Sequence, residues 1–431
     1  MWHSGKMVAP YAMREIELTE PLRPLALREG EGGAHVLVRR KGRPLARLWI
    51  SRAEHGAELP VDELDRLIRG VAAEAAARHS LREALLGEPE RQPTPSLTVA
   101  VCTRNRADLL RRCLAPLVAL RDERRHLGPE IDILVVDNAP PDDSTRVAAA
   151  EFAGVRYVCE PVPGLNFGRN RALASTTREW LAFVDDDAVV DRFWLDRLAE
   201  GVAASPDAGG FTGPILPLML ETEAQLRFEY AGGFGKGFDW ERFSRERWND
   251  RIYPSNAGRF GTGACMVHST SLLRELGGFD EALDTGAPLP GGGDIDMFYR
   301  VVRSGRPLVY LPGLLVFHEH RRDMPGLRKQ YYSWGLSVAA LMRKSIRCAP
   351  ETRPSQHRFM RWWLRRHAIR LVKALAGRDV SPPRLVLAEI LGGIIGYFGE
   401  YERSQKRIAL RRQSVIGQGL PIASCERRVE T

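Results

Sequence analysis

The stretch Trp180-Leu-Ala-Phe-Val-Asp-Asp-Asp187 places three consecutive carboxylates directly after a short apolar run. Aromatic and β-branched residues in a run of this length predict a buried strand. Clustered carboxylates repel one another, so a fold seldom keeps them together unless a cation or sugar hydroxyls lie against them. Oxygen ligands suit Mg²⁺ or Mn²⁺, which also accept a phosphate as ligand. A solvated acidic turn is the alternative interpretation.

An alternation of strands and helices surrounds this stretch. Strands are expected over residues 97–102, 131–136 and 156–159, and helices over 107–120 and 168–175. Such an alternation predicts an α/β fold with a mainly parallel sheet and helices on both faces. Ligands of these sheets bind at the carboxyl ends of the strands.

Polar residues follow several of these strands at their carboxyl ends. Thr103 and Arg104 follow the first strand, Asp137 follows the second, and the carboxylate triplet follows the strand over 180–184. We therefore expect these side chains to converge. No G-x-G-x-x-G motif follows the first strand and the chain contains no G-x-x-x-x-G-K-[ST] loop, which excludes two common nucleotide sites. A nucleotide site built from side chains and a metal remains.

The regions before and after this alternation have a different pattern. Two strands are expected within residues 34–50, around the turn Lys41-Gly42-Arg43, and a helix over 61–86 ends at Gly87. Its apolar face comprises Leu64, Leu67, Ile68, Val71 and Ala75. A proline-rich linker covers 88–95. The expected domains are an N-terminal α+β accessory domain (1–90), a catalytic domain (95–322) and a helical C-terminal extension (323–431).

Composition limits the classes of function. The 431 residues carry a net charge of +9, which favours anionic partners. Nucleic acid is not an expected partner, because no zinc finger, RRM signature or basic zipper is present. Six scattered cysteines without a C-x-x-C pair indicate a reducing cytoplasm. Neither a secretory signal nor an apolar stretch of about 20 residues is visible, so we expect a soluble protein.

Eight short motifs, taken together and in order, resemble family 2 glycosyltransferases, which are inverting enzymes with the GT-A fold that use nucleotide-sugar donors. The resemblance spans roughly residues 95–320. Its motifs are Val99-Ala-Val-Cys-Thr-Arg-Asn-Arg106, Val135-Val-Asp-Asn138, Gly164-Leu-Asn-Phe-Gly-Arg-Asn-Arg-Ala172, Phe183-Val-Asp-Asp-Asp187, Gly261-Thr-Gly-Ala264, Gly277-Gly-Phe-Asp280, Gly292-Gly-Asp-Ile-Asp-Met297 and Phe317-His-Glu-His320.

The resemblance implies a donor site. Asp137 matches the carboxylate that binds the base, although an Asx-turn residue is the alternative. Thr103 and Arg104 match the loop around base and ribose, and Arg104 is otherwise a surface charge. Arg169 matches an arginine near the nucleotide. Gly263 matches a position beneath the donor sugar, where glycine permits close backbone approach.

The resemblance also implies a metal site with Mn²⁺ or Mg²⁺. Asp187 would coordinate the cation that bridges the two phosphates, and His318 would complete the site. Asp185 would reach the ribose or donor sugar, and Asp186 would assist either role. A bound cation stabilises the charge of a departing nucleoside diphosphate. For His318 the alternative is a packed or surface histidine.

Asp294 matches the catalytic aspartate of the family. It would accept the proton of the acceptor hydroxyl as that oxygen attacks the anomeric carbon. Helix capping is the alternative role. The family usually has Glu-Asp here, whereas this chain has Gly293-Asp294, which puts in doubt the acceptor contacts of the missing glutamate.

The tail contains amphipathic patterns. Leu327, Tyr331, Trp334, Val338 and Leu341 recur at helical spacing, and a second segment mixes aromatic residues with arginines at 358–373. Packing against the catalytic domain and peripheral contact with an anionic membrane on the inner face are both compatible with this pattern. In either case, the tail is expected to line one side of the acceptor cleft.

The sequence thus predicts a metal-assisted, inverting, hexosyltransferase-type glycosyltransferase. Its donor would be a UDP-, GDP- or dTDP-sugar, and its acceptor a hydroxyl of a saccharide, a lipid-linked molecule or a natural product. Two alternatives are a sugar-nucleotide pyrophosphorylase and a non-catalytic carbohydrate-binding module of the same fold. A pyrophosphorylase would need a glycine-rich loop after its first strand, and this chain lacks such a loop.

Overall fold

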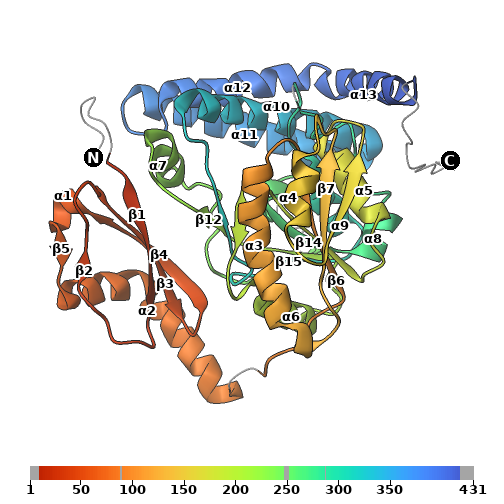
Figure 1. The fold of residues 1–431 in the computed structure, drawn as a ribbon. Coiled ribbons are helices and arrows are strands. Elements are labelled where there is room, and N and C mark those ends of the chain that lie inside the picture. Colours follow the sequence, from red (N-terminus) through yellow and green to blue (C-terminus); the bar gives the residue numbers. More distant parts are fainter. Residues whose placement is uncertain (1–8, 88–89, 247–251, 287, 418–431) are drawn as a thin grey trace.

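The structure is a computed structural model that describes residues 9–87, 90–246, 252–286 and 288–417 (Figure 1). Two residues of the expected linker, 88 and 89, and both ends of the chain lie outside the described residues. An N-terminal α+β unit, a central sheet with helices on both faces, and a layer of long helices follow one another along the chain.

The central sheet has eight strands in the order β13-β15-β11-β14-β9-β6-β7-β8. The expected parallel arrangement is confirmed for its second half, where β9, β6, β7 and β8 run parallel. β14 is antiparallel to β9 and β11, and β13 is antiparallel to β15. The bounds are β6 Leu97–Thr103, β7 Asp132–Asn138, β8 Val155–Glu160, β9 Trp180–Val184, β11 Gly210–Thr212, β13 Glu241–Phe243, β14 Cys265–Ser269 and β15 Leu308–Tyr310.

Apolar side chains of this sheet are buried on both faces, as in a three-layer fold. One cluster joins the sheet to α3 and α6 through Leu114 and Trp194, and the other joins it to α5, α8 and α9 through Leu173, Leu272 and Phe298. The helix bounds are α3 Ala107–Glu123, α4 Ser144–Ala150, α5 Leu165–Ala174, α6 Trp194–Ala204, α8 Thr270–Glu275 and α9 Gly293–Arg303.

The start of α5 differs from the prediction. It begins at Leu165, three residues before the expected start at 168. Gly164 precedes it with a φ of 148°, a conformation that favours glycine, so the chain turns into the helix earlier than the apolar pattern suggests.

A small three-stranded sheet carries the histidine of the predicted metal site. Its order is β10-β16-β12, with bounds Ala188–Val190, Val316–His318 and Ile215–Pro217. In the antiparallel pairing of β10 with β16, His318 lies opposite Ala188. Because Ala188 directly follows Asp187, this register brings His318 to the carboxylate triplet.

The N-terminal unit confirms the predicted strand pair and helix. β3 and β4 form an antiparallel hairpin, β1 adds to β3 in parallel, and α2 ends at Gly87. Val71 is not on the buried face of α2, because it is 47% exposed while Ala72 packs in the core. The bounds are β1 Tyr11–Glu17, β2 Leu25–Ala26, β3 Gly33–Arg40, β4 Arg43–Ser51, α1 Arg52–His55, β5 Glu58–Leu59 and α2 Val61–Leu86.

The C-terminal segment forms a layer of long helices, drawn in blue along the top of Figure 1. α10 packs on the catalytic part through Leu336 and Ala340, which share a cluster with Val162 and Phe167. Packing of this helix against the catalytic domain is therefore confirmed. The bounds are α7 Glu223–Tyr230, α10 Met324–Cys348, α11 Arg353–Leu375, α12 Pro383–Tyr397 and α13 Glu400–Gly417.

α10 and α12 approach each other closely because glycines face the contact. A Cβ atom at Gly335 would lie 1.9 Å from the carbonyl oxygen of Glu389, and one at Gly392 would lie 2.0 Å from that of Tyr332. Within the described part of the chain, none of the helices combines the length and hydropathy that a membrane span requires.

Candidate functional site

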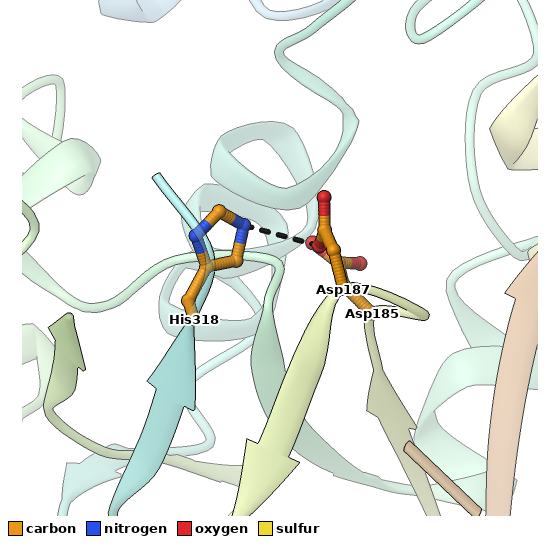
Figure 2. A group of neighbouring side chains, drawn as sticks. All are labelled: Asp185, Asp187 and His318. Carbon is orange, nitrogen blue, oxygen red and sulfur yellow. Dashed lines mark ion pairs between the residues drawn. The ribbon is translucent and has the colours of Figure 1, made fainter. Parts of the chain in front are cut away.

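Asp185, Asp187 and His318 come together at the carboxyl ends of β9 and β16 (Figure 2). One ligand atom from each residue lies within 4.8 Å of the others. His318 Nε2 is 3.1 Å from Asp187 Oδ1, the ion pair that Figure 2 marks with a dashed line. Two carboxylates and one imidazole form a donor set that fits Mn²⁺ or Mg²⁺ better than a soft metal.

The electrostatics of this corner follow from burial and close charges. Burial, together with the charge of Asp187, raises the pKa of Asp185 to about 6. Burial acts in the same direction on Asp187, but His318 and Arg106 outweigh it and hold the pKa of Asp187 below its usual value. For His318, burial opposes protonation, yet the neighbouring Asp187 raises its pKa. The corner therefore holds net negative charge that a cation would neutralise.

Asp186, the middle member of the triplet, faces the loop after β6. Its Oδ2 accepts a hydrogen bond from Thr103 Oγ1 at 2.6 Å, and its Oδ1 accepts one from Arg106 Nη1 at 2.9 Å. Both carboxylate oxygens thus have protein donors. Thr103 and Asp186, two predicted donor-binding residues, contact each other, and Arg106 is a contact that the sequence interpretation had missed.

A buried chain of contacts leads from the metal corner to the N-terminal unit. His318 Nδ1 is 3.4 Å from His320 Nδ1, and His320 Nε2 is 3.1 Å from Glu229 Oε2 on α7. Glu229 also forms an ion pair with Arg47 on β4. His320 belongs to the motif Phe317-His-Glu-His320 but was not predicted as a ligand. Glu229 and Arg47 were not singled out, since no local motif marks them.

This series of contacts favours one tautomer of each histidine when the ring is neutral. The Glu229 carboxylate requires a proton on His320 Nε2, so His320 Nδ1 is left to accept a hydrogen bond from His318 Nδ1. The remaining nitrogen of His318, Nε2, faces Asp187 and pairs with it when protonated; a cation in the site would replace that proton and use the Nε2 lone pair. That tautomer is the one a metal ligand needs.

Arg169 lies at the centre of the site on α5. It is buried, and its Nη1 forms an ion pair with Asp284 Oδ2 at 2.8 Å and donates to Asn166 Oδ1 at 3.0 Å. The charges of Asp185, Asp284 and Asp294 all act on Arg169, and together they outweigh burial and raise its pKa. Asp284 was not predicted; it is a non-glycine residue with a φ of 53°, which no sequence motif reveals.

Asp294 stands in the first turn of α9 and is partly exposed. Its Oδ2 accepts a hydrogen bond from the backbone N–H of Gly263 at 2.7 Å, while the next residue, Ala264, accepts one through its carbonyl from the N–H of Asp185 at 3.4 Å. Two consecutive residues therefore connect the candidate base with the carboxylate triplet.

Glycine is required at two positions beside Asp294. A Cβ atom at Gly263 would lie 2.8 Å from Arg169 and 3.1 Å from the Asp294 side chain. A Cβ atom at Gly293 would lie 2.3 Å from Asp284 Oδ2. Asp284 and Asn166 thus fill the space of the glutamate that the family usually has at position 293.

Asp137 and Arg104 lie at the edges of this arrangement. Asp137 is buried at the end of β7, opposite Thr103 in the sheet register. Its Oδ2 accepts a hydrogen bond from Tyr157 at 3.0 Å, and its buried Oδ1 has no hydrogen-bond partner among the described residues. Burial raises the pKa of Asp137. Arg104 is exposed and makes no hydrogen bond or ion pair with the triplet within the described part of the chain.

The sheet and the carboxylate corner at its strand ends have the arrangement that the resemblance to the GT-A fold predicts. The profile of "Glycosyl transferase family 2" matches residues 98–266 of the chain.

Known proteins similar to the chain include two curated relatives and one solved structure. The "Pre-mycofactocin glycosyltransferase" of Mycobacterium tuberculosis is 28% identical over 65% of this chain and 55% of its own length. "Polypeptide N-acetylgalactosaminyltransferase 3" of Mus musculus is 28% identical over 45% of this chain and 32% of its own length. A mannosyltransferase from Pyrobaculum calidifontis in complex with GDP-Man and Mn²⁺ shows 19% identity and a TM-score of 0.44, over 79% of this chain and 93% of that one. The chain spans about half the length of its M. tuberculosis relative.

Proposed function

We propose that the chain transfers a sugar, with inversion, from a nucleoside-diphosphate sugar to a hydroxyl acceptor. The observation that carries this proposal is the convergence of Asp294 with Asp185, Asp187 and His318 through the adjacent residues Gly263 and Ala264. A pocket with one carboxylate toward an acceptor and others toward a cation suits an inverting displacement.

Donor binding in this proposal uses the strand ends. Asp137 Oδ1, buried and unpaired among the described residues, is suited to accept a hydrogen bond from a nucleobase N–H. Asp187, His318 and Asp185 would hold Mn²⁺ or Mg²⁺, which supplies positive charge to the diphosphate when bound. Arg169 adds a fixed, buried positive charge beside the sugar position beneath Gly263.

Asp294 is the proposed general base. It removes the proton of the acceptor hydroxyl while that oxygen forms a bond to the anomeric carbon. The bond from the anomeric carbon to the phosphate oxygen breaks, and the nucleoside diphosphate leaves with the electron pair. The hydrogen bond from Gly263 N–H holds the carboxylate in place, so that its second oxygen is available to the acceptor.

A donor screen on the full chain tests this function. UDP-, GDP- and dTDP-sugars are added with and without Mn²⁺, and the melting temperature and the release of nucleoside diphosphate are measured. We expect one base to stabilise the protein, and only with the metal present. Stabilisation by none of the three overturns the proposal, and pyrophosphate-dependent formation of a nucleoside triphosphate supports the pyrophosphorylase alternative instead.

We further propose peripheral contact of the helical layer with an anionic membrane. Support comes from a row of exposed apolar residues on α12 and directly after it, together with exposed basic residues on the neighbouring helix α11 such as Arg361 and Arg365. The row consists of Leu387, Leu391, Ile394, Ile395 and Phe398. Co-flotation with vesicles containing phosphatidylglycerol, but not with pure phosphatidylcholine, is the expected result; no flotation with either contradicts it.

A further inference from the structure

A cavity of about 420 Å³ lies beside Asp294, between the catalytic part and the helical layer. The cavity is lined by Ile295 of α9, which follows the candidate base in sequence. Gly258 of the short helix η3 (Ala257–Arg259) also lines it. Helices α10 and α11 close the other side with Val338, Met342 and Phe359. Its size is that of a small-molecule site, which typically measures about 300–1,000 Å³.

The wall of this cavity is apolar, but its charges are all of one sign. Aliphatic and aromatic side chains form most of it, whereas Lys236, Arg259 and Arg366 supply three positive charges. None of the described residues that line the cavity carries a carboxylate. Arg259 has a distant acidic neighbour, Glu241 at 3.9 Å, and Arg366 lies 5.4 Å from the centre of the Trp362 ring.

Two buried polar atoms of the wall lack partners. Asn256 and Tyr299 are 8% and 4% exposed, and neither Asn256 Oδ1 nor the Tyr299 hydroxyl has a hydrogen-bond partner among the described residues. Buried polar groups are nearly always hydrogen-bonded, so these two atoms offer unused hydrogen-bonding capacity in the residues that line the cavity.

Lys236 connects the cavity with the candidate base. Crowding by the surrounding protein lowers the pKa of Lys236, the charges of Arg259 and Arg366 add to this effect, and Asp294 opposes it. Lys236, Arg259 and Arg366 thus line one cavity, and Asp294 is close enough to Lys236 for the two charges to interact.

A neighbouring pocket of about 540 Å³ shows that the charge pattern is specific. It shares Trp362 and Arg366 with the first cavity, but Asp379 and Glu389 also line it. Both carboxylates form ion pairs with Arg370, at 3.7 and 3.6 Å. The positive charge of that pocket is thus partly balanced by carboxylates of its own wall, unlike the charge beside Asp294.

We propose that the cavity lined by Ile295, Val338, Phe359, Lys236 and Arg366 binds an acceptor with an apolar body and an anionic group. The assignment as an acceptor site rests on the proposed function. In it, the apolar body packs between α9, α10 and α11, and the anionic group pairs with the cations at the mouth. The acceptor hydroxyl is then presented to Asp294. A carboxylate on an aromatic body and a phosphate on an aliphatic chain share this chemistry.

Two fluorescent probes test the site on the full chain. 8-Anilino-1-naphthalenesulfonate has an apolar body and an anionic group, and N-phenyl-1-naphthylamine has the same body without charge. We expect Arg366→Gln and Lys236→Gln each to weaken binding of the anionic probe by about tenfold, the scale of one charge-assisted contact, and to leave the neutral probe within twofold. Val338→Trp, which fills the cavity, should weaken both probes by at least about tenfold.

Matched variants separate the cavity from the rest of the surface. Arg365→Gln removes the neighbouring exposed charge that does not line the cavity, and Leu391→Gln alters the exposed apolar row of α12. Both should bind the probes like the natural chain. Equal losses for Arg365→Gln and Arg366→Gln, or a loss for Leu391→Gln alone, overturn the proposal. If Val338→Trp does not fold, the charge variants decide.

Competition then identifies the source of the anion. Displacement of the anionic probe by decyl phosphate but not by 2-naphthoate indicates a phosphorylated aliphatic acceptor, and the reverse result indicates an aromatic carboxylate. Displacement by neither overturns the proposal. Donor turnover by the natural chain is measured separately, so that a failure of the proposed glycosyl transfer and a failure of the cavity assignment are distinguishable.

Discussion

The N-terminal unit and the C-terminal helical layer both reach the catalytic site, but with different kinds of contact. The N-terminal unit uses charged and aromatic groups: Arg43 pairs with Glu200, Arg47 pairs with Glu229, and Trp49 stacks on Tyr230 at 4.1 Å. The helical layer combines apolar packing around Leu336 and Ala340 with the ion pairs of Lys344 to Asp280 and Asp296, both at 2.7 Å.

The difference indicates which part of the site, the metal corner or the surroundings of Asp294, each of the two units supports. Charged contacts are directional and can fix a tautomer or a side-chain position, and the contact of Arg47 with Glu229 leads through His320 to the metal corner. Apolar packing shapes a cavity and excludes water, and it lies on the side of Asp294. We therefore expect changes in the N-terminal unit to alter metal binding and changes in the helical layer to alter acceptor binding.

Asp187→Asn should have the largest effect, and this effect should be confined to metal-dependent donor binding. The amide is a weaker ligand for a hard cation and removes one negative charge from the corner. We expect calorimetry with the nucleoside diphosphate that the donor screen identifies to show no Mn²⁺-dependent binding. Undiminished Mn²⁺-dependent affinity would mean that Asp187 is not a ligand.

Asp294→Asn should affect the acceptor side alone. Asparagine keeps the shape and can still accept the hydrogen bond of Gly263, but it cannot accept a proton. Turnover should fall at least about a hundredfold, the usual scale of general-base help, while donor affinity stays nearly unchanged. Transfer at the normal rate by this variant would show that another group is the base.

Glu229→Gln should weaken metal binding, although Glu229 is not itself one of the proposed metal ligands. The amide is a poorer acceptor for His320 Nε2, so the tautomer that leaves His318 Nε2 unprotonated is less favoured. Outer residues of this kind typically change metal affinity by about 10–100-fold. Calorimetric titration with Mn²⁺ in the presence of the nucleotide measures the change, and circular dichroism checks the fold.

Arg47 and Arg43 provide a matched pair for the same question. Both lie on β4, both pair with a glutamate of the catalytic part, and their side chains are 25% and 27% exposed. Only the partner of Arg47 contacts His320. Arg47→Ala should therefore lower Mn²⁺ affinity more than Arg43→Ala does. Equal losses would mean that the N-terminal unit acts through general stability.

The sequence predicts the residues of the metal corner better than the distant residues that hold them in place. Asp185 and Asp187 are found because the carboxylate triplet follows a short apolar strand, and His318 because it lies in a motif of the family resemblance; both are local patterns. Glu229 is 182 residues from Arg47 and 91 from His320, and Asp284 is 115 from Arg169. Such contacts depend on how distant elements pack, and nothing in the neighbouring residues marks them. The roles of Asp137, Asp294 and Arg169 as donor or catalytic groups stay predictions.

His35 offers the smallest expected effect and extends the comparison to pH. This histidine of β3 is fully buried against Trp49, and its ring nitrogens have no hydrogen-bond partner among the described residues. Burial is the largest influence, and it lowers the pKa of His35 from 6.5 to about 4. A depressed histidine pKa gives stability that is present above pH 6.5 and is lost as the pH falls from 6.5 toward 4.

Between pH 7 and 5, His35 should therefore cost the N-terminal unit about 2 kcal/mol of stability. Hydrogen exchange of β3 and β4 at both pH values measures this loss, and His35→Phe, which cannot be protonated, should remove most of it. The apolar contact of α10 with α12 should show little change over the same range, because the glycines at that contact do not titrate. If both regions lose the same protection on acidification, or if His35→Phe does not change the loss, His35 is not a neutral buried histidine. Either result would also weaken the distinction between the N-terminal unit and the helical layer.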